Sequence, residues 1–291
     1  YLGSSFAFIG VVIAATGYAG SGPNANLPVA LGGIVACGLV YTLVGFAVMA
    51  SGTAWIERLM PPVVTGAVVA VIGLNLAPIA VKGASSTPFD AWMAVTTILC
   101  VGGIAVFTRG LVQRLLILVG LALACVIYGI LANGMGLGKP IALAGIAAAP
   151  WIGAPRFAAP VFDGNAIALI APVAVILVAE NLGHLKAVGA MTGRNLDPMI
   201  GRAFVGDGVA TMIAGSVGGT GVTTYAENIG VMAVTKIYST LVFVVAAAIA
   251  VVLGFSPKFG ALIQAIPAAV LGGVSIVVFG LIAAAGARIW V

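Results

Sequence analysis

Long apolar runs, separated by short polar connections, occupy almost the whole sequence. A transmembrane helix needs about 20 predominantly apolar residues, and by this measure the chain contains ten candidate spans, of which the first and eighth are short. They lie at residues 6–19, 27–50, 61–81, 91–107, 110–132, 164–184, 203–217, 225–236, 239–254 and 266–287. The pattern predicts an all-α polytopic membrane protein.

Two stretches break this pattern, because Gly and hydroxyl residues replace Leu and Val just where the two short spans begin. These stretches, YLGSSFAF and TGVTTYAE, read as short β-like segments, each followed by a half-helix. Such backbone is tolerated at membrane depth only when it is buried in protein or lines a cavity. We therefore expect both stretches to lie inside the protein, at a functional position.

The two stretches also resemble each other, which indicates an internal repeat. Ser4–Ala7 corresponds to Thr223–Ala226, and the segment that begins at Pro61 corresponds to the one that begins at Pro267. Paired interruptions of this kind are typical of secondary transporters built from inverted repeats, which bind substrate where the interruptions meet. Completing the symmetry adds about two spans at each end, so we interpret the chain as a fragment of a seven-plus-seven inverted-repeat fold.

Composition agrees with a membrane protein and excludes several other classes. Hydrophobic residues make up 62% of the chain and charged residues only 7%, against about 25% charged in soluble domains. The twelve Lys and Arg residues give a net charge of +5 but form no basic stripe, so nucleic acid is not an expected partner. The expected partner of the surface is the lipid bilayer.

No motif of an enzyme, metal site or cofactor site is found. The sequence has one His and lacks CxxC, HExxH, GxxxxGK[ST] and GxSxG patterns, which carry metal, nucleotide and nucleophile chemistry. We therefore predict no catalytic residue, no metal and no cofactor beyond a coupling ion. A channel would need rings of like residues, and none is visible.

Ionisable side chains inside predicted spans are costly, so they usually face a transport pathway or a partner. Glu180 ends the apolar run IALIAPVAVILVA, and His184 follows one helical turn later on the same face. This pair can hold or pass a proton. The alternative interpretation is a solvated pair at a helix end.

A second group of candidates surrounds the eighth span. Glu227 lies where TGVTTYAE becomes a helix, so its carboxylate either binds a polar ligand or only caps the N-terminal N–H groups. Phe6 and Tyr225 are matched aromatic positions that either sandwich a flat ring or merely pack. Asp207 has a structural or a coupling role, and the sequence leaves both open.

Other polar residues are expected to have local roles. Hydroxyl groups beside irregular backbone commonly bond that backbone rather than a ligand, although Thr224 and Asn228 are also candidates for support of the site. Glu57 and Arg58 are interpreted as an interfacial pair, and Lys186 as part of a solvated loop. The hydroxyl residues expected to bond local backbone are Ser4, Ser5, Thr223 and Thr224.

The strings YLGSSFAFIG, AENLGHLKAVGAMTG and TTYAENIGVMAVTKIYST resemble the uracil permeases of the nucleobase:cation symporter family, in its uracil/xanthine branch. They are most similar to pyrimidine-utilisation permeases, and the resemblance covers essentially all 291 residues. It implies a bacterial inner-membrane transporter with a core domain and a gate domain that move past each other. The expected ranges are core at 1–50 and 163–256, gate at 51–135 and 257–291, and an external crossover loop at 136–162.

The resemblance also implies roles for the candidate residues. Glu180 and Glu227 match the carboxylates that hold the base, and His184 matches the histidine linked to proton coupling. Phe6 and Tyr225 match aromatic positions at the site. The backbone amides of Phe6 and Ala226 match donors to the carbonyl oxygens of the base.

Two positions depart from the family pattern, and one indicates the substrate. Asn181 stands where well-known uracil permeases have a second His, and Ala226 stands where they have Gly. The Glu227–Asn228 pair resembles the uracil side of the family, whereas purine permeases typically have Gln at the first position.

The expected function is proton-coupled uptake of uracil or a related pyrimidine base. The alternatives are a xanthine or purine permease and an anion transporter of the same fold, which two carboxylates in the cavity argue against. The sequence leaves open whether Na⁺ replaces H⁺ and whether the protein forms a homodimer.

Overall fold

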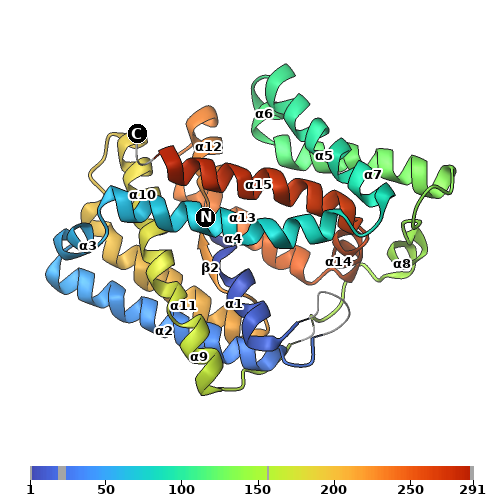
Figure 1. Cartoon of the computed structure of the whole chain (residues 1–291). Helices are drawn as coiled ribbons and strands as arrows, with labels where there is room; N and C mark the ends of the chain where they lie inside the picture. The colour runs from blue at the N-terminus through green and yellow to red at the C-terminus, as the bar shows by residue number, and fades with distance from the viewer. Residues whose placement is uncertain (1, 19–23, 156, 289–291) are drawn as a thin grey trace. The chain divides into compact units, whose positions relative to one another are not determined.

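The computed structural model describes residues 2–18, 24–155 and 157–288 (Figure 1). Two short strands, β1 (Leu2–Ser4) and β2 (Val222–Thr224), accompany a largely helical chain. The first helices are α1 (Ala7–Thr16), α2 (Leu27–Ser51), α3 (Ala54–Leu59), α4 (Pro62–Ala84), α5 (Pro88–Phe107), α6 (Leu111–Arg114), α7 (Leu116–Gly129), the π-helical turn η1 (Ile130–Gly134) and α8 (Leu143–Ala148). The others are α9 (Gly164–Ile170), α10 (Val173–Thr192), the 3-10 turn η2 (Asp197–Met199), α11 (Ile200–Val217), α12 (Ala226–Thr235), α13 (Thr240–Gly254), α14 (Pro257–Gln264) and α15 (Ala268–Arg288).

Each of the ten predicted spans coincides with one or more helices. Not all of these helices are long enough to cross a membrane. Among the described residues, six helical segments are long and apolar enough to span a bilayer. A seventh results if α13 and α14, which meet at a bend of 84°, count as one span. α1 and α12 have ten residues each, so they are too short to span alone. The chain is a polytopic membrane protein, and the count of ten spans stays a prediction.

The two extended stretches pair with each other, as the repeat predicted. β1 and β2 form an antiparallel ladder in which Leu2 faces Thr224 and Ser4 faces Val222. The Ser5 amide donates to the Gly221 carbonyl at 3.0 Å and continues the pairing by one bond. Each strand leads directly into a ten-residue helix. The backbone groups that a helix would have satisfied internally are therefore satisfied between the two strands.

The chain divides into two compact units. The first unit comprises Tyr1–Ile72, Arg156–Ala233 and Ala284–Val291, and the second comprises Gly73–Pro155 and Val234–Ala283. The assignment of core and gate roles to parts of the chain stays a prediction, as does the seven-plus-seven inverted repeat.

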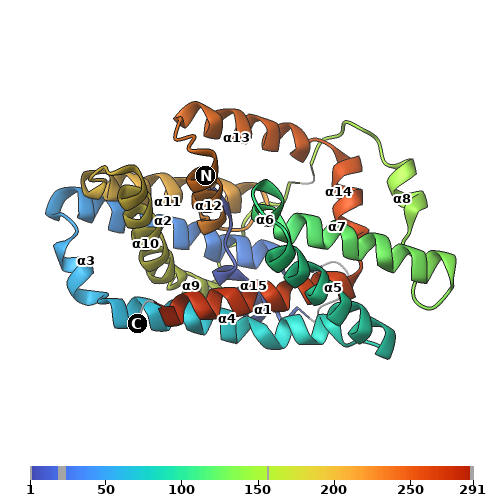
Figure 2. The ribbon, with the colours of Figure 1, turned by 90° about the horizontal axis from the view of Figure 1, so that it is seen from above.

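In the first unit, α2 and α11 pack along most of their lengths, because glycines bring their backbones together (Figure 2). A Cβ on Gly38 would lie 2.7 Å from the Gly208 carbonyl oxygen, and one on Gly45 would lie 2.7 Å from the Val205 nitrogen. Small residues that permit such close approach are typical of helix contacts in membranes. Tyr41 and Phe204 contact each other between the same helices, with ring centroids 5.3 Å apart and ring planes tilted by 36°.

In the second unit, α5 and α7 pack against each other. Phe89 and Tyr128 meet edge to face at 5.4 Å, and Met93 and Ala124 are buried beside them. The part of the predicted crossover loop that lies in this unit contains the short helix α8. By contrast, none of the fifteen residues of α13 is buried.

Candidate functional site

The polar face of α10 lies against β2, and two consecutive threonines of the strand reach the two predicted proton carriers. The Thr223 hydroxyl donates to Oε2 of Glu180 at 3.1 Å. The Thr224 hydroxyl lies 2.7 Å from Nδ1 of His184. Both threonines are buried, whereas Glu180 and His184 are half-buried.

The expectation that these two hydroxyls bond local backbone was therefore wrong. Their partners lie 43 and 40 residues earlier in the chain, on α10. Nothing in the sequence around the two threonines indicates that this helix packs against β2. For Ser5 the expectation was right, because its hydroxyl accepts from the Ala7 amide at 3.3 Å. Thr224, a candidate for support, thus contacts one of the predicted site residues.

Tyr225 follows β2 and is fixed against β1. Its hydroxyl donates to the Ser4 carbonyl. A Cβ added to Gly3 would lie 2.6 Å from Cε2 of the tyrosine ring, so the ring rests directly on the glycine backbone. A side chain at Gly3 would have to move the ring.

The starts of α1 and α12 supply backbone N–H groups close to the strand pair. Phe6 is half-buried and occupies the N-cap position of α1, and Ala226 and Glu227 are the first two residues of α12. The first N–H groups of a helix lack intrahelical acceptors, and the positive end of the helix dipole adds to their attraction for an acceptor.

Several of the predicted contacts to the base stay predictions. The side chains of Ala226 and Glu227 lie outside the described residues, and those of Pro62, Val234 and Arg288 do as well. The sandwich of a ring between Phe6 and Tyr225 and the support from Asn228 are also untested.

Asp207 belongs to a buried polar cluster between α2, α10 and α11. Nδ2 of Asn181 donates both to a carboxylate oxygen of Asp207 and to the Tyr41 hydroxyl, the latter at 2.8 Å. The Tyr41 hydroxyl in turn donates to the Leu177 carbonyl at 3.3 Å. Asn181 and Tyr41 are fully buried and Asp207 is 5% exposed. The sequence left a structural and a coupling role open for Asp207, and it did not indicate the participation of Tyr41.

Nδ2 of Asn181 donates two hydrogen bonds, whereas its Oδ1 accepts none from the described residues. Among the described residues, its Oδ1 is the one buried side-chain N or O atom without a hydrogen-bond partner. Leaving such an acceptor unpaired costs about 1–3 kcal/mol. The cluster is therefore held together by the two hydrogen bonds that Nδ2 of Asn181 donates.

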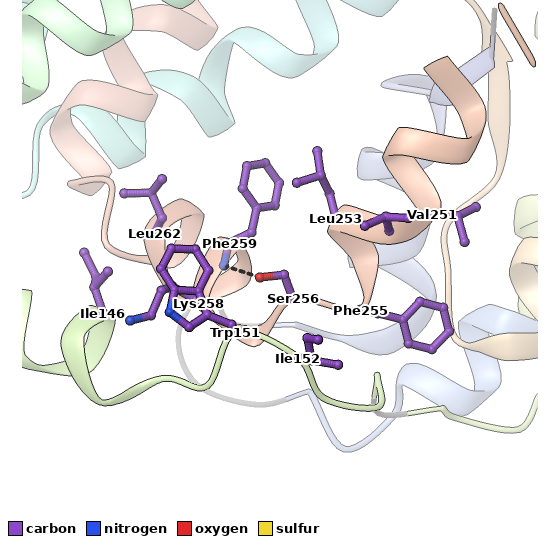
Figure 3. A pocket seen from close by; sticks show the side chains of 11 residues that line it. Ile146, Trp151, Ile152, Val251, Leu253, Phe255, Ser256, Lys258, Phe259 and Leu262 are labelled. Atoms are coloured by element: carbon purple, nitrogen blue, oxygen red, sulfur yellow. Dashed lines mark hydrogen bonds between the residues drawn. The ribbon is translucent and has the colours of Figure 1, made fainter. Parts of the chain in front are cut away.

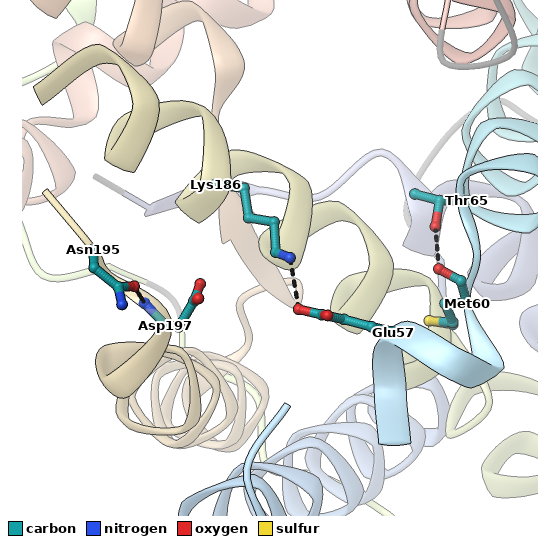
Figure 4. A network of polar contacts seen from close by, with 6 residues as sticks. All are labelled: Glu57, Met60, Thr65, Lys186, Asn195 and Asp197. Carbon is teal, nitrogen blue, oxygen red and sulfur yellow. Dashed lines mark hydrogen bonds and ion pairs between the residues drawn. The ribbon is translucent and has the colours of Figure 1, made fainter. Parts of the chain in front are cut away.

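A polar contact also joins α3 to α10 (Figure 4). Nζ of Lys186 lies 2.6 Å from Oε1 of Glu57, with both side chains partly exposed. The predicted pairing of Glu57 with Arg58 was wrong, and Lys186 lies in α10 rather than in a loop. Neighbours in sequence do not face each other on a helix, which explains the error.

Two cavities among the described residues have walls too apolar to bind a base. One, of about 690 Å³, lies in the second unit beside the bend between α13 and α14 (Figure 3). Its polar wall residues are Ser256 and Lys258, whose ammonium lies 4.8 Å from the centre of the Trp151 ring. The other, of about 320 Å³, is lined by aliphatic residues with Trp55 and Met60. Neither is lined by a carboxylate or amide side chain that could accept from ring N–H groups.

The chain is similar to known membrane permeases. Residues 1–291 match the sequence model described as Permease family, that of the xanthine and uracil permeases. The chain is 72% identical over 291 residues to "Putative pyrimidine permease RutG" of Escherichia coli (strain K12), covering 100% of this chain and 66% of that protein. It is 39% identical to the uracil permease of Paenibacillus larvae, covering 100% of this chain and 69% of that protein. It is 38% identical to the uracil permease of Escherichia coli (strain K12), covering 99% and 66%. The chain thus spans about two thirds of the length of these relatives, which are permeases rather than enzymes.

Proposed function

Since this chain belongs to the xanthine and uracil permease family, we propose that the protein is a proton-coupled symporter of uracil or a closely related pyrimidine base in the bacterial inner membrane. The observation that carries the proposal is the pairing of β1 with β2 beside α10. This pairing places two helix starts, a carboxylate and a histidine around one short segment of backbone.

The chemistry of that segment suits a pyrimidine ring. Uracil presents two N–H donors and two carbonyl acceptors at the edge of a flat ring. Glu180 supplies a carboxylate acceptor, and the amides of Phe6 and Ala226 at the starts of α1 and α12 are suited to the carbonyl oxygens. Charged acceptors form stronger hydrogen bonds than neutral ones, so Glu180 and Glu227 are proposed to hold the ring N–H groups.

Coupling to protons is proposed to use the same face of α10. Glu180 and His184 are separated by one helical turn, so a proton held by one is close to the other. Histidine exchanges protons near neutral pH more readily than other side chains do. In this scheme, protonation of the pair and binding of the base favour the same conformation. This coupling links uptake of the base to the proton gradient.

Purine transport is the second candidate, because the family includes xanthine permeases. The Glu227–Asn228 pair and the names of the relatives at 72% and 39% identity favour pyrimidines. An anion transporter is less well supported, since Glu180 is a carboxylate beside the strand pair.

The decisive experiment measures uptake of labelled uracil by the full-length gene product in cells that lack their own uracil permease. Unlabelled uracil, thymine and xanthine serve as competitors, and a protonophore and the replacement of Na⁺ identify the coupling ion. We expect uracil to compete best and the protonophore to abolish accumulation. Stronger competition by xanthine, or loss of uptake only when Na⁺ is removed, would overturn the assignment of substrate or ion.

A further inference from the structure

We propose that Thr224 is a positioning residue: it holds His184 through Nδ1 and leaves Nε2 as the nitrogen that exchanges the coupling proton. The inference rests on the proposed function, because it assigns a task to the histidine of a proton-coupled permease. It goes beyond that function by identifying β2 as the structural connection between the base and the proton carrier.

The first argument is the geometry of the imidazole. The Thr224 hydroxyl lies 2.7 Å from Nδ1, and the threonine is 6% exposed, so the contact is short and largely shielded. Its backbone is fixed by the strand pairing, in which Thr224 faces Leu2. The two ring nitrogens of a histidine are not equivalent, and the partner of one determines the protonation of the other. Since Nδ1 is engaged, Nε2 is the position at which the ring can exchange a proton.

The second argument is the position of Thr224 along the chain. The next residue, Tyr225, is tied to β1 by its bond to the Ser4 carbonyl and by the contact of its ring with Gly3. Tyr225 also immediately precedes α12, the helix whose start is proposed to meet the base. A shift of this backbone on base binding therefore reaches the His184 contact through a single peptide bond. A hydrogen bond of 2.7 Å weakens greatly when it is stretched beyond about 3.5 Å, so a small movement is sufficient.

The third argument is that the neighbouring threonine acts on the other half of the pair. Thr223 donates to Glu180 at 3.1 Å and is 2% exposed. Two consecutive hydroxyls of one strand thus hold the proposed base ligand and the proposed proton carrier. A shift of this strand therefore changes both contacts at once, which is what coupling requires of a shared element.

The test compares Thr224→Val, which keeps the shape of the side chain but removes the hydroxyl, with Thr224→Ser, which keeps the hydroxyl. Thr97→Val is the matched control, since Thr97 is a buried threonine whose hydroxyl, among the described residues, bonds its own helix at the Met93 carbonyl. Three quantities are measured on the full-length protein: equilibrium affinity for uracil, the accumulation ratio in energised vesicles, and the ¹⁵N chemical shifts of the His184 ring, assigned with His184→Gln.

For Thr224→Val, we expect affinity within about threefold of wild type, an accumulation ratio at least tenfold lower, and altered ¹⁵N shifts at Nδ1. Thr224→Ser should restore both accumulation and shifts, and Thr97→Val should change neither. The proposal is overturned if the valine variant keeps wild-type ring shifts, or if it loses affinity and accumulation equally without rescue by serine. Because the ring shifts need no substrate, they test this inference even if uracil proves not to be transported.

Discussion

A methyl group at Gly208 should disrupt the contact between α2 and α11. A Cβ there would lie 2.3 Å from Oγ1 of Thr42 and 2.7 Å from both the Gly38 carbonyl oxygen and the Thr42 nitrogen. The hydroxyl could rotate away, but the other two atoms belong to the backbone of α2. Reaching 3.4 Å, an ordinary contact, requires the helices to separate by about 0.7 Å.

The size of the effect follows from this geometry. Overpacking of a close contact typically costs about 1–3 kcal/mol, which corresponds to a fall in Tm of several degrees in domains of this size. The adjacent residue, Asp207, would move with α11 relative to Asn181, its partner on α10. Gly208→Ala is therefore expected to reduce stability and uptake together.

Gly206→Ala is the matched control on the same helix. A Cβ on Gly206 meets no neighbouring atom within 4 Å, so this variant should not lower the Tm and should raise it slightly, because Ala in a helix interior is more favourable than Gly by about 0.5–1 kcal/mol. Thermal unfolding of both purified full-length variants in detergent gives the comparison. Equal Tm values for Gly208→Ala and Gly206→Ala would refute the view that glycine contacts hold α2 against α11.

Three further predictions concern the strand pair, the ion pair and the histidine. Gly3→Ala should displace the Tyr225 ring and weaken uracil binding more than Tyr225→Phe does, as measured by equilibrium titration; equal effects would contradict the contact. Glu57→Gln should change Tm by no more than about two degrees, because an exposed bond to Lys186 is worth about 0–1 kcal/mol; a larger fall in thermal unfolding would show that the ion pair is structural. His184→Ala should lower the accumulation ratio far more than the affinity for uracil, and wild-type accumulation in vesicles would exclude His184 from coupling.

Local sequence was sufficient to predict the long helices and the two strands, because each depends on nearby residues, but it did not predict the short helices α3, α8 and α14. Apolar runs of span length became helices, and the stretches in which Gly, Ser and Thr replace Leu and Val became β1 and β2. Their pairing was predictable as well, since the match of Ser4–Ala7 with Thr223–Ala226 indicated symmetry-related positions.

The contacts that organise the site depend instead on which helices pack together. Asn181 and Tyr41 are 140 residues apart, and Glu57 and Lys186 are 129 apart. No periodicity within either segment specifies such a partner. The sequence made Glu180 a candidate from the cost of burying ionisable groups, and His184 from its place one helical turn later. The threonine that holds each of them became evident only from the packing of β2 against α10.

Asn181 illustrates how a departure from a family pattern acquires a physical meaning. The resemblance to the uracil permeases implies a histidine at that position, and a neutral imidazole has one N–H to donate. An amide nitrogen has two, and Asn181 uses both, toward Asp207 and toward Tyr41. A neutral histidine at the same position could satisfy only one of these acceptors through an N–H group. The asparagine therefore joins the carboxylate of α11 to the tyrosine of α2 through a single atom of α10, which ties all three helices together one residue away from Glu180.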